Sequence, residues 1–94
     1  MTNFTVRVEL RDADSSDYDD LYDRMSDNGF SKFITAESGN EYQLPNAEYT
    51  YSSGSKTRRQ VKDLAFKIAC EVNDDPAVLV TQSDGRVWEG LKRN

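Results

Sequence analysis

Three aspartates lie close together where the first predicted strand gives way to the first predicted helix: Asp12, Asp14 and Asp17. Paired carboxylates at such a junction could hold Mg²⁺ and activate a water molecule for attack on a phosphodiester. The spacing lacks the glycine and the terminal glutamate of an EF-hand loop. Aspartate is also the ordinary residue of turns and helix caps. The sequence therefore assigns no metal ligands, and Mg²⁺ stays a candidate cofactor beside a purely structural interpretation.

A run of basic residues opens the second predicted helix: Lys56, Arg58, Arg59 and Lys62. Cations at a helix N-terminus oppose the helix dipole, so the placement is favourable when an anion lies there too. Together with the backbone N–H groups of residues 53–57, these side chains could cradle a phosphate. The alternative is that they pair with the acidic first helix. The segment Gly54–Thr57 lacks the spacing of a P-loop.

Aromatic residues recur on the predicted strands and their edges: Phe33, Tyr42, Tyr49, Tyr51 and Trp88. On an open sheet face, beside Arg7 and Arg86, they could stack the bases of single-stranded RNA. The RNP1 pattern of an RNA-recognition motif is absent. The same residues could instead complete a small core or an oligomer interface.

The charge of the chain is unevenly distributed. The 94 residues carry a formal net charge of −5, which repels nucleic acid at long range, so an RNA contact requires a local basic patch. Residues 1–30 hold eight acids and three arginines, whereas residues 55–72 hold five bases and two acids. Only the second segment offers such a patch.

Several classes of chemistry are excluded by composition. The chain has no histidine, which rules out Ser-His-Asp and Cys-His catalysis and zinc sites that use imidazole. Its one cysteine, Cys70, has no intramolecular partner for a disulfide. No apolar run approaches the roughly 18 residues of a membrane span. We therefore expect a cytoplasmic protein with no membrane partner.

Two amphipathic helices are predicted. Tyr18, Leu21, Tyr22 and Met25 form one apolar stripe at helical spacing. We expect this helix over Asp17–Asn28, with Ser16 and Asp19 as a capping box and Gly29 ending it. The second helix begins with a capping box of Thr57 and Gln60 and ends before Pro76. Its apolar stripe consists of Val61, Leu64, Ala65, Ile68 and Val72.

Strands are predicted from alternating or continuous apolar runs: Phe4–Leu10, Phe30–Glu37, Glu41–Leu44, Ala47–Tyr51, Ala77–Gln82 and Arg86–Leu91. The order of elements is typical of an α+β, ferredoxin-like βαββαβ two-layer sandwich, here with an extra C-terminal hairpin strand. We expect one such domain over residues 1–94, with both helices on one face of an antiparallel sheet and the other face open. Phe66 and Cys70 lie off the apolar stripe, which suggests a second contact such as a homodimer partner.

Segments along nearly the whole chain are similar, in order and length, to one known family: Phe4–Leu10, Asp27–Phe30, Tyr42–Pro45 with Glu48 and Tyr49, and the basic-led second helix. They resemble the GhoS-type family, the small antitoxins of type V toxin–antitoxin systems. The resemblance implies a ferredoxin-like fold close to that of the CRISPR-associated Cas2 proteins. It also implies an endoribonuclease that cuts the messenger RNA of a small membrane-damaging toxin. Such nucleases place an aspartate near the end of the first strand, a position that Asp12 or Asp14 could fill.

The leading functional hypothesis is thus an antitoxin that cleaves single-stranded RNA. Without histidine, two routes remain. Either a metal held by Asp12 and Asp14 activates water, or Arg11, Arg58 and Arg59 stabilise the phosphorane while the RNA 2′-OH attacks. The alternative is a non-catalytic, acidic ferredoxin-like module that binds a protein or RNA partner.

Overall fold

Two helices and two antiparallel sheets make up this α+β protein, whose residues 1–93 are described by a computed structural model. The strands are β1 (Thr2–Leu10), β2 (Phe33–Thr35), β3 (Glu41–Gln43), β4 (Glu48–Ser53) and β5 (Pro76–Ser83). The helices are α1 (Ser15–Asp27) and α2 (Arg58–Cys70). Neither helix is long and apolar enough to cross a membrane, and residues 1–93 contain no other helix.

The larger sheet has the strand order β4-β1-β5, with β1 antiparallel to both neighbours. The predicted period-two alternation of β1 is confirmed, because Phe4, Val6, Val8 and Leu10 are all buried while the residues between them are at least partly exposed. Directly opposite residues of an antiparallel pair point to the same face. The other face therefore carries polar pairs such as Thr5 with Thr50 and Arg7 with Glu48.

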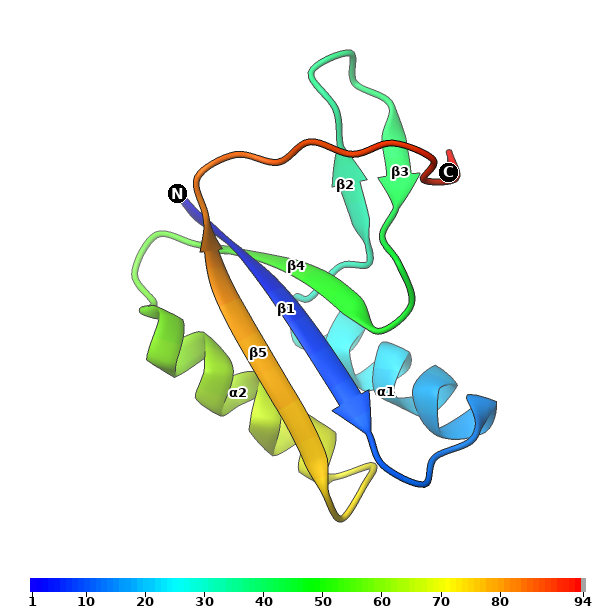
Figure 1. Cartoon of the computed structure of the whole chain (residues 1–94). Coiled ribbons are helices and arrows are strands. Elements are labelled where there is room, and N and C mark those ends of the chain that lie inside the picture. Colours follow the sequence, from blue (N-terminus) through cyan, green and yellow to red (C-terminus); the bar gives the residue numbers. More distant parts are fainter. Residues whose placement is uncertain (94) are drawn as a thin grey trace.

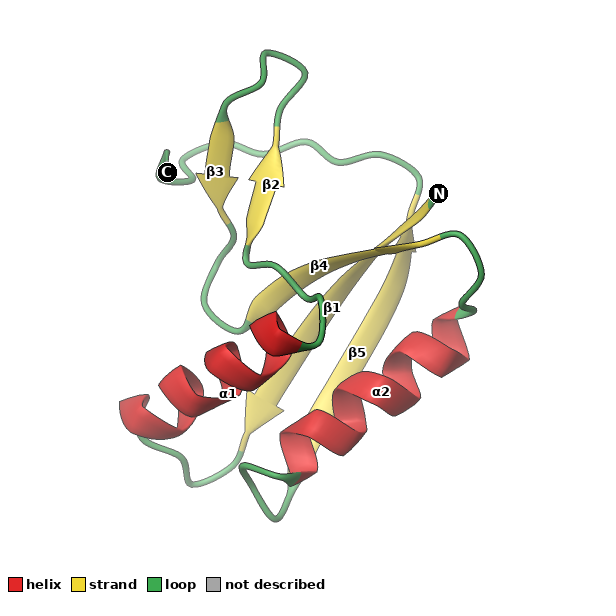
Figure 2. Ribbon diagram, turned by 180° about the vertical axis from the view of Figure 1, so that it is seen from behind, coloured by secondary structure: helices red, strands yellow, loops and turns green. Residues whose placement is uncertain are grey.

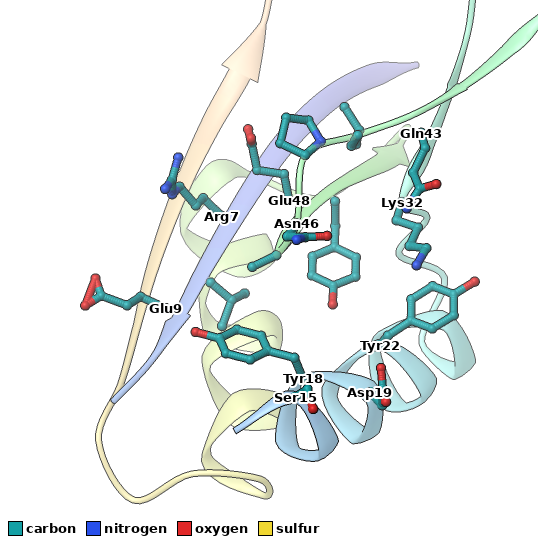
Figure 3. Close-up of a pocket in the computed structure, with 15 residues that line it drawn as sticks. Arg7, Glu9, Ser15, Tyr18, Asp19, Tyr22, Lys32, Gln43, Asn46 and Glu48 are labelled. Carbon is teal, nitrogen blue, oxygen red and sulfur yellow. The ribbon is translucent and has the colours of Figure 1, made fainter. Parts of the chain in front are cut away.

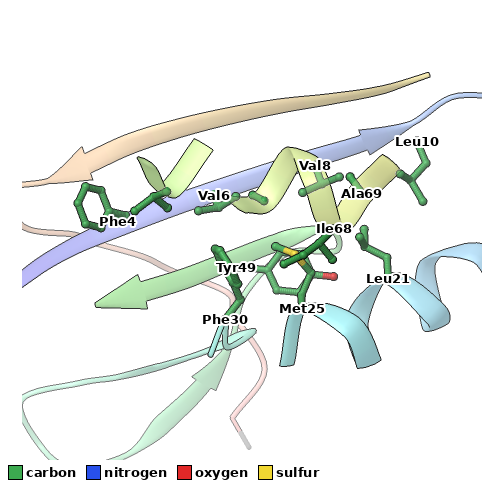
Figure 4. Packing of buried hydrophobic residues seen from close by; sticks show 12 residues of the cluster. Phe4, Val6, Val8, Leu10, Leu21, Met25, Phe30, Tyr49, Ile68 and Ala69 are labelled. Carbon is green, nitrogen blue, oxygen red and sulfur yellow. The ribbon is translucent and has the colours of Figure 1, made fainter. Parts of the chain in front are cut away.

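Both helices cover the same face of this sheet, as expected (Figures 1 and 2). Each helix contributes apolar residues to the single core cluster: Leu21 and Met25 from α1, and Val61, Ala65, Ile68 and Ala69 from α2. They pack on the buried residues of β1 and on Tyr49 of β4 (Figure 4). Phe66 and Cys70 lie on the exposed side of α2, in agreement with their position off the stripe.

The two helices differ in how well their starts could be predicted. For α2 the capping box of Thr57 and Gln60 is confirmed, with each side chain bonded to the other residue's backbone N–H. For α1 the predicted cap at Ser16 is wrong. The box is formed by Asp14 and Asp17, and the helix begins two residues earlier. Ser16 lies inside the helix, where its hydroxyl donates to the Asp14 carboxylate instead.

The chain between α1 and β4 leaves the larger sheet and forms a separate hairpin, β2–β3. The backbone pairing of this segment with β4 is an isolated bridge between Ser31 and Thr50. Beyond that bridge the chain pairs with β3 instead, since the Leu44 N–H donates to the Lys32 carbonyl. The predicted strand over Phe30–Glu37 is therefore reduced to three residues.

The predicted C-terminal hairpin strand over Arg86–Leu91 is wrong. After β5 the chain crosses to the β2–β3 hairpin instead of returning beside β5 (Figure 1). Its anchors there are the Gln43 N–H, which donates to the Lys92 carbonyl, and a bridge between Tyr42 and Arg93. Trp88 packs on Tyr42, with ring centroids 5.7 Å apart. These distant contacts replace the local pairing that the Asp84-Gly85 turn indicated.

Candidate nucleic-acid interface

The basic cluster, defined as Lys56, Arg58, Arg59 and Lys62, lies at the first turn of α2 and in the loop before it. This turn follows the end of β4, where Ser53 pairs with Thr2. The start of α2 is on the side of the molecule away from α1 (Figure 1). All of these side chains are exposed except that of Lys62, which is half-buried.

The loop ahead of α2 already uses part of its own hydrogen-bonding capacity. The Ser53 hydroxyl accepts from the N–H groups of Ser55 and Lys56, at 3.1 and 2.9 Å. The N–H groups of Arg58 and Arg59 find no acceptor within residues 1–93. A phosphate cradle built from the whole loop is therefore reduced to these two donors and the side chains around them.

The alternative in which the cluster pairs with the acidic first helix is not what the structure contains. Lys62 pairs with its neighbour Asp63, and no other member of the cluster forms an ion pair with any residue from 1 to 93. The ion pair between the two helical segments has the opposite polarity: the cation is Arg24 of α1 and the carboxylate is Glu71, the C-cap residue of α2, at 3.7 Å. Three cations thus stay unneutralised beside the free N–H groups.

Asp12 and Asp14 have different surroundings at the junction of β1 and α1. The Asp14 carboxylate accepts from the Ser16 hydroxyl and the Asp17 N–H, and these hydrogen bonds lower its pKa. Asp12 is exposed and has a positive φ of 52°, a conformation that aspartate adopts more readily than most residues. No group of three or more potential acidic or thiol ligands converges on a metal position in the described chain.

Arg11 is held by the loop between α2 and β5. Its guanidinium donates to the Asp75 carbonyl at 2.9 Å and pairs with the Asp75 carboxylate at 3.0 Å. The Asn73 amide in turn donates to the Arg11 carbonyl. Arg11 and the basic cluster lie at opposite ends of α2, so the structure does not bring the predicted catalytic arginine together with Arg58 and Arg59.

Tyr49 and Tyr51 do not line the open sheet face. Tyr49 is buried on the helix face, and Tyr51 stacks on Phe30 with ring centroids 4.5 Å apart. Arg86 does reach the open face, where its guanidinium donates to the Thr5 hydroxyl, the Thr50 hydroxyl and the Phe4 carbonyl. The interpretation of Tyr49 as a core residue is therefore confirmed, and Trp88 is the member of the aromatic set that lines a cavity with Thr5 and Arg86.

A cavity of about 560 Å³, which sequence reasoning missed, lies between α1, the end of β1 and the segment that joins β3 to β4 (Figure 3). Tyr18, Tyr22 and Tyr49 line it, together with Lys32 and Asn46. The Lys32 ammonium lies over the Tyr22 ring, 4.3 Å from its centroid. Tyr18 and Tyr22 could have indicated this cavity, because they are the two residues of the predicted α1 stripe that carry a hydroxyl.

Comparison of the chain with protein-family models and with curated proteins gives no match. The basic cluster and the cavity therefore have to be interpreted from their own geometry.

Proposed function

We propose that this protein is a single-stranded RNA-binding domain of the GhoS type, in which the basic cluster contacts the phosphates. The observation that carries the proposal is the set of exposed cations at the start of α2, of which only Lys62 has an acidic partner within residues 1–93. A helix N-terminus that already carries unneutralised cations is well suited to an anion. The rest of the surface is acidic enough to confine RNA to this region.

A ferredoxin-like topology is part of this proposal. The order β4-β1-β5, the helices on one face, and the bridge between Ser31 and Thr50 on the outer edge of β4 all support it. In a ferredoxin-like sheet of four strands, the segment around Ser31 would be the outer strand next to β4, here shortened to a single bridge. The GhoS-type assignment adds the substrate, the messenger RNA of a small membrane toxin.

RNA binding is tested by titrating a fluorescently labelled single strand at several salt concentrations. If Arg58 and Arg59 each contact a phosphate, Arg58→Ala/Arg59→Ala weakens binding and reduces the salt slope of log K by about 1.4, since each contact contributes about 0.7. Lys67→Ala is the matched control, because Lys67 is an exposed cation near the other end of α2. Equal losses in the two variants would contradict the proposal.

Cleavage is the second part of the proposal and has its own test. Of the predicted catalytic residues, Asp12 is the carboxylate with no hydrogen bond or ion pair to other residues between 1 and 93. Asp12→Asn is expected to abolish cleavage of toxin messenger RNA while leaving RNA affinity unchanged. Loss of cleavage in EDTA supports Mg²⁺-activated water, and undiminished cleavage supports attack by the RNA 2′-OH with arginine assistance.

A non-catalytic binding module is the second candidate function, and one observation favours it. Asp14 and Arg11 are both engaged in structural contacts, as the helix cap and as the partner of Asp75. Such a module would dock a protein or a second copy of itself through the free edge of β5 or through Phe66, whose side chain is 43% exposed. Absence of RNA binding at low salt, with a dimer in sedimentation, would favour this candidate.

A further inference from the structure

The cavity beside α1 is reached by a hydroxyl that has no partner in the described part of the chain. Tyr49 is only 3% exposed, yet no residue from 1 to 93 forms a hydrogen bond with its hydroxyl. No side-chain oxygen of the described residues is both fully buried and unsatisfied, so this hydroxyl reaches the cavity. An accessible phenol hydroxyl can both donate and accept a hydrogen bond. Tyr49 therefore offers a hydrogen-bonding group, held by a buried ring, to a molecule that enters the cavity.

The other lining groups define the chemistry of that molecule. Tyr18 extends from α1 toward β1 and Tyr22 toward Lys32, while Asn46 lies across the cavity from α1, so aromatic surface lies on one side and an amide on the other (Figure 3). Gln43 lines the cavity as well, and neither amide side chain has a hydrogen bond to the described chain. An amide presents a donor and an acceptor side by side, which matches the edge of a nucleobase.

The charges around the cavity disfavour an anion. Arg7 and Glu9 point away from it (Figure 3), which leaves the acidic residues Asp19 and Glu48 and the cation Lys32 as its other charged lining residues. Lys32 is already engaged with the Tyr22 ring. A phosphate group would meet a net negative rim, whereas an uncharged ring would not.

The volume of the cavity beside α1 is also appropriate for a small molecule. A cavity of about 560 Å³ falls within the roughly 300–1,000 Å³ of ligand pockets. The second cavity, near the C-terminal segment, differs because its guanidinium, that of Arg86, is already bonded to Thr5 and Thr50. It holds no comparable orphan group.

We infer that this cavity binds an uncharged purine or pyrimidine ring, with Tyr49 donating to a ring acceptor and Asn46 and Gln43 contacting its edge. The site is separate from the basic cluster, which lies on the far side of the molecule (Figure 1), and does not depend on the RNA-binding proposal. The ring is either a free nucleoside or a base of a bound strand.

The test titrates the full chain with adenosine, guanosine, cytidine and uridine. Binding is measured by calorimetry and by the NMR chemical shifts of the backbone amides of Asn46 and Ala47. At least one nucleoside should bind, independently of salt and no more weakly than its 5′-monophosphate. Tyr49→Phe should weaken it about tenfold, the worth of one hydrogen bond. Tyr42→Phe is the matched control, because Tyr42 packs on Trp88 and lies outside the cavity.

Three results would overturn the inference: no binding of any nucleoside at millimolar concentration, tighter binding of the monophosphates, or unchanged affinity in a folded Tyr49→Phe variant. Ribose alone should not shift these amides. Displacement of the nucleoside by a short single-stranded oligonucleotide would identify the source as RNA, and failure to displace it would identify a free nucleoside. Arg58→Ala/Arg59→Ala should leave nucleoside affinity unchanged, so the two proposals fail separately.

Discussion

The hydroxyl of Tyr18 takes the place of a strand partner for Leu10. It accepts from the Leu10 N–H at 3.0 Å and donates to the Leu10 carbonyl at 3.3 Å. The pairing of β4 with β1 ends at Arg7, and the Val8 N–H is the last on that edge to find a backbone acceptor, at Ala47. A helix side chain therefore completes an edge that the sheet leaves open, and it fixes α1 against the end of β1.

Replacement of Tyr18 by Phe should destabilise the protein, because both backbone groups of Leu10 lose their partner in a half-buried position. The expected loss in unfolding free energy is about 1–2 kcal/mol, measured as a lower urea midpoint at constant slope. Tyr22→Phe is the matched control, since the Tyr22 hydroxyl bonds to no residue between 1 and 93. Equal midpoints for the two variants would show that Tyr18 contributes through its ring alone.

Asp14→Ala should destabilise α1 in a pH-dependent way. The cap hydrogen bonds lower the pKa of Asp14 from its ordinary value of 3.8. A lowered folded pKa stabilises the protein above the unfolded pKa, and this contribution is lost as pH falls through the folded value. The urea midpoints of Asp14→Ala and the parent chain should therefore converge in strong acid.

The matched control for that experiment is Thr57→Ala, which removes the equivalent cap of α2. A cap hydroxyl costs about 1 kcal/mol to remove, and because threonine does not titrate, this difference should persist in acid relative to the parent chain. Convergence of both variants with the parent would mean that acid unfolds the helix starts generally and that Asp14 has no specific role.

Arg86→Met should release the C-terminal segment from the open face of the larger sheet. The guanidinium bonds to Thr5, Thr50 and the Phe4 carbonyl, and burial lowers its pKa without discharging it at neutral pH. We expect a loss of about 1–2 kcal/mol and faster trypsin cleavage after Lys92 and Arg93. Arg7→Met on the same face should do neither, because the exposed Arg7 side chain forms no hydrogen bond or ion pair within the described chain.

Elements with a local signal were predictable from the sequence, and contacts between distant residues were not. The alternation of β1 and the stripe and cap of α2 depend on residues a few positions apart. Arg86 reaches Thr5 and Thr50 over sequence separations of 81 and 36 residues, so the path of the C-terminal segment carried no local signature. The turn at Gly85 suggested a hairpin, yet Trp88 packs on the distant Tyr42.

The candidate sites also divide into one with a local sequence signal and one that depends on distant contacts. The basic cluster could be found because its residues are neighbours in sequence, and its lack of partners in α1 only became visible with the helix arrangement. The cavity depends on where β4 stops pairing and on where the segment around Ala47 turns, with its positive φ of 64°. The sequence spacing of Tyr18, Tyr22 and Tyr49 does not predict that all three line the same cavity.

The ionisation of Tyr49 supplies the last prediction. Burial, with the nearby Tyr22 and Tyr18 phenols, raises its pKa from 10.0 to about 12. Because the folded state holds this proton more tightly than the unfolded state, stability is fully present below pH 10.0 and falls as pH rises toward 12. Ultraviolet titration should show one tyrosine ionising after the others, and Tyr49→Phe should remove both that step and part of the alkaline loss of stability. If Tyr42→Phe removes the same step, the late-titrating phenol lies outside the cavity and Tyr49 is not held neutral there.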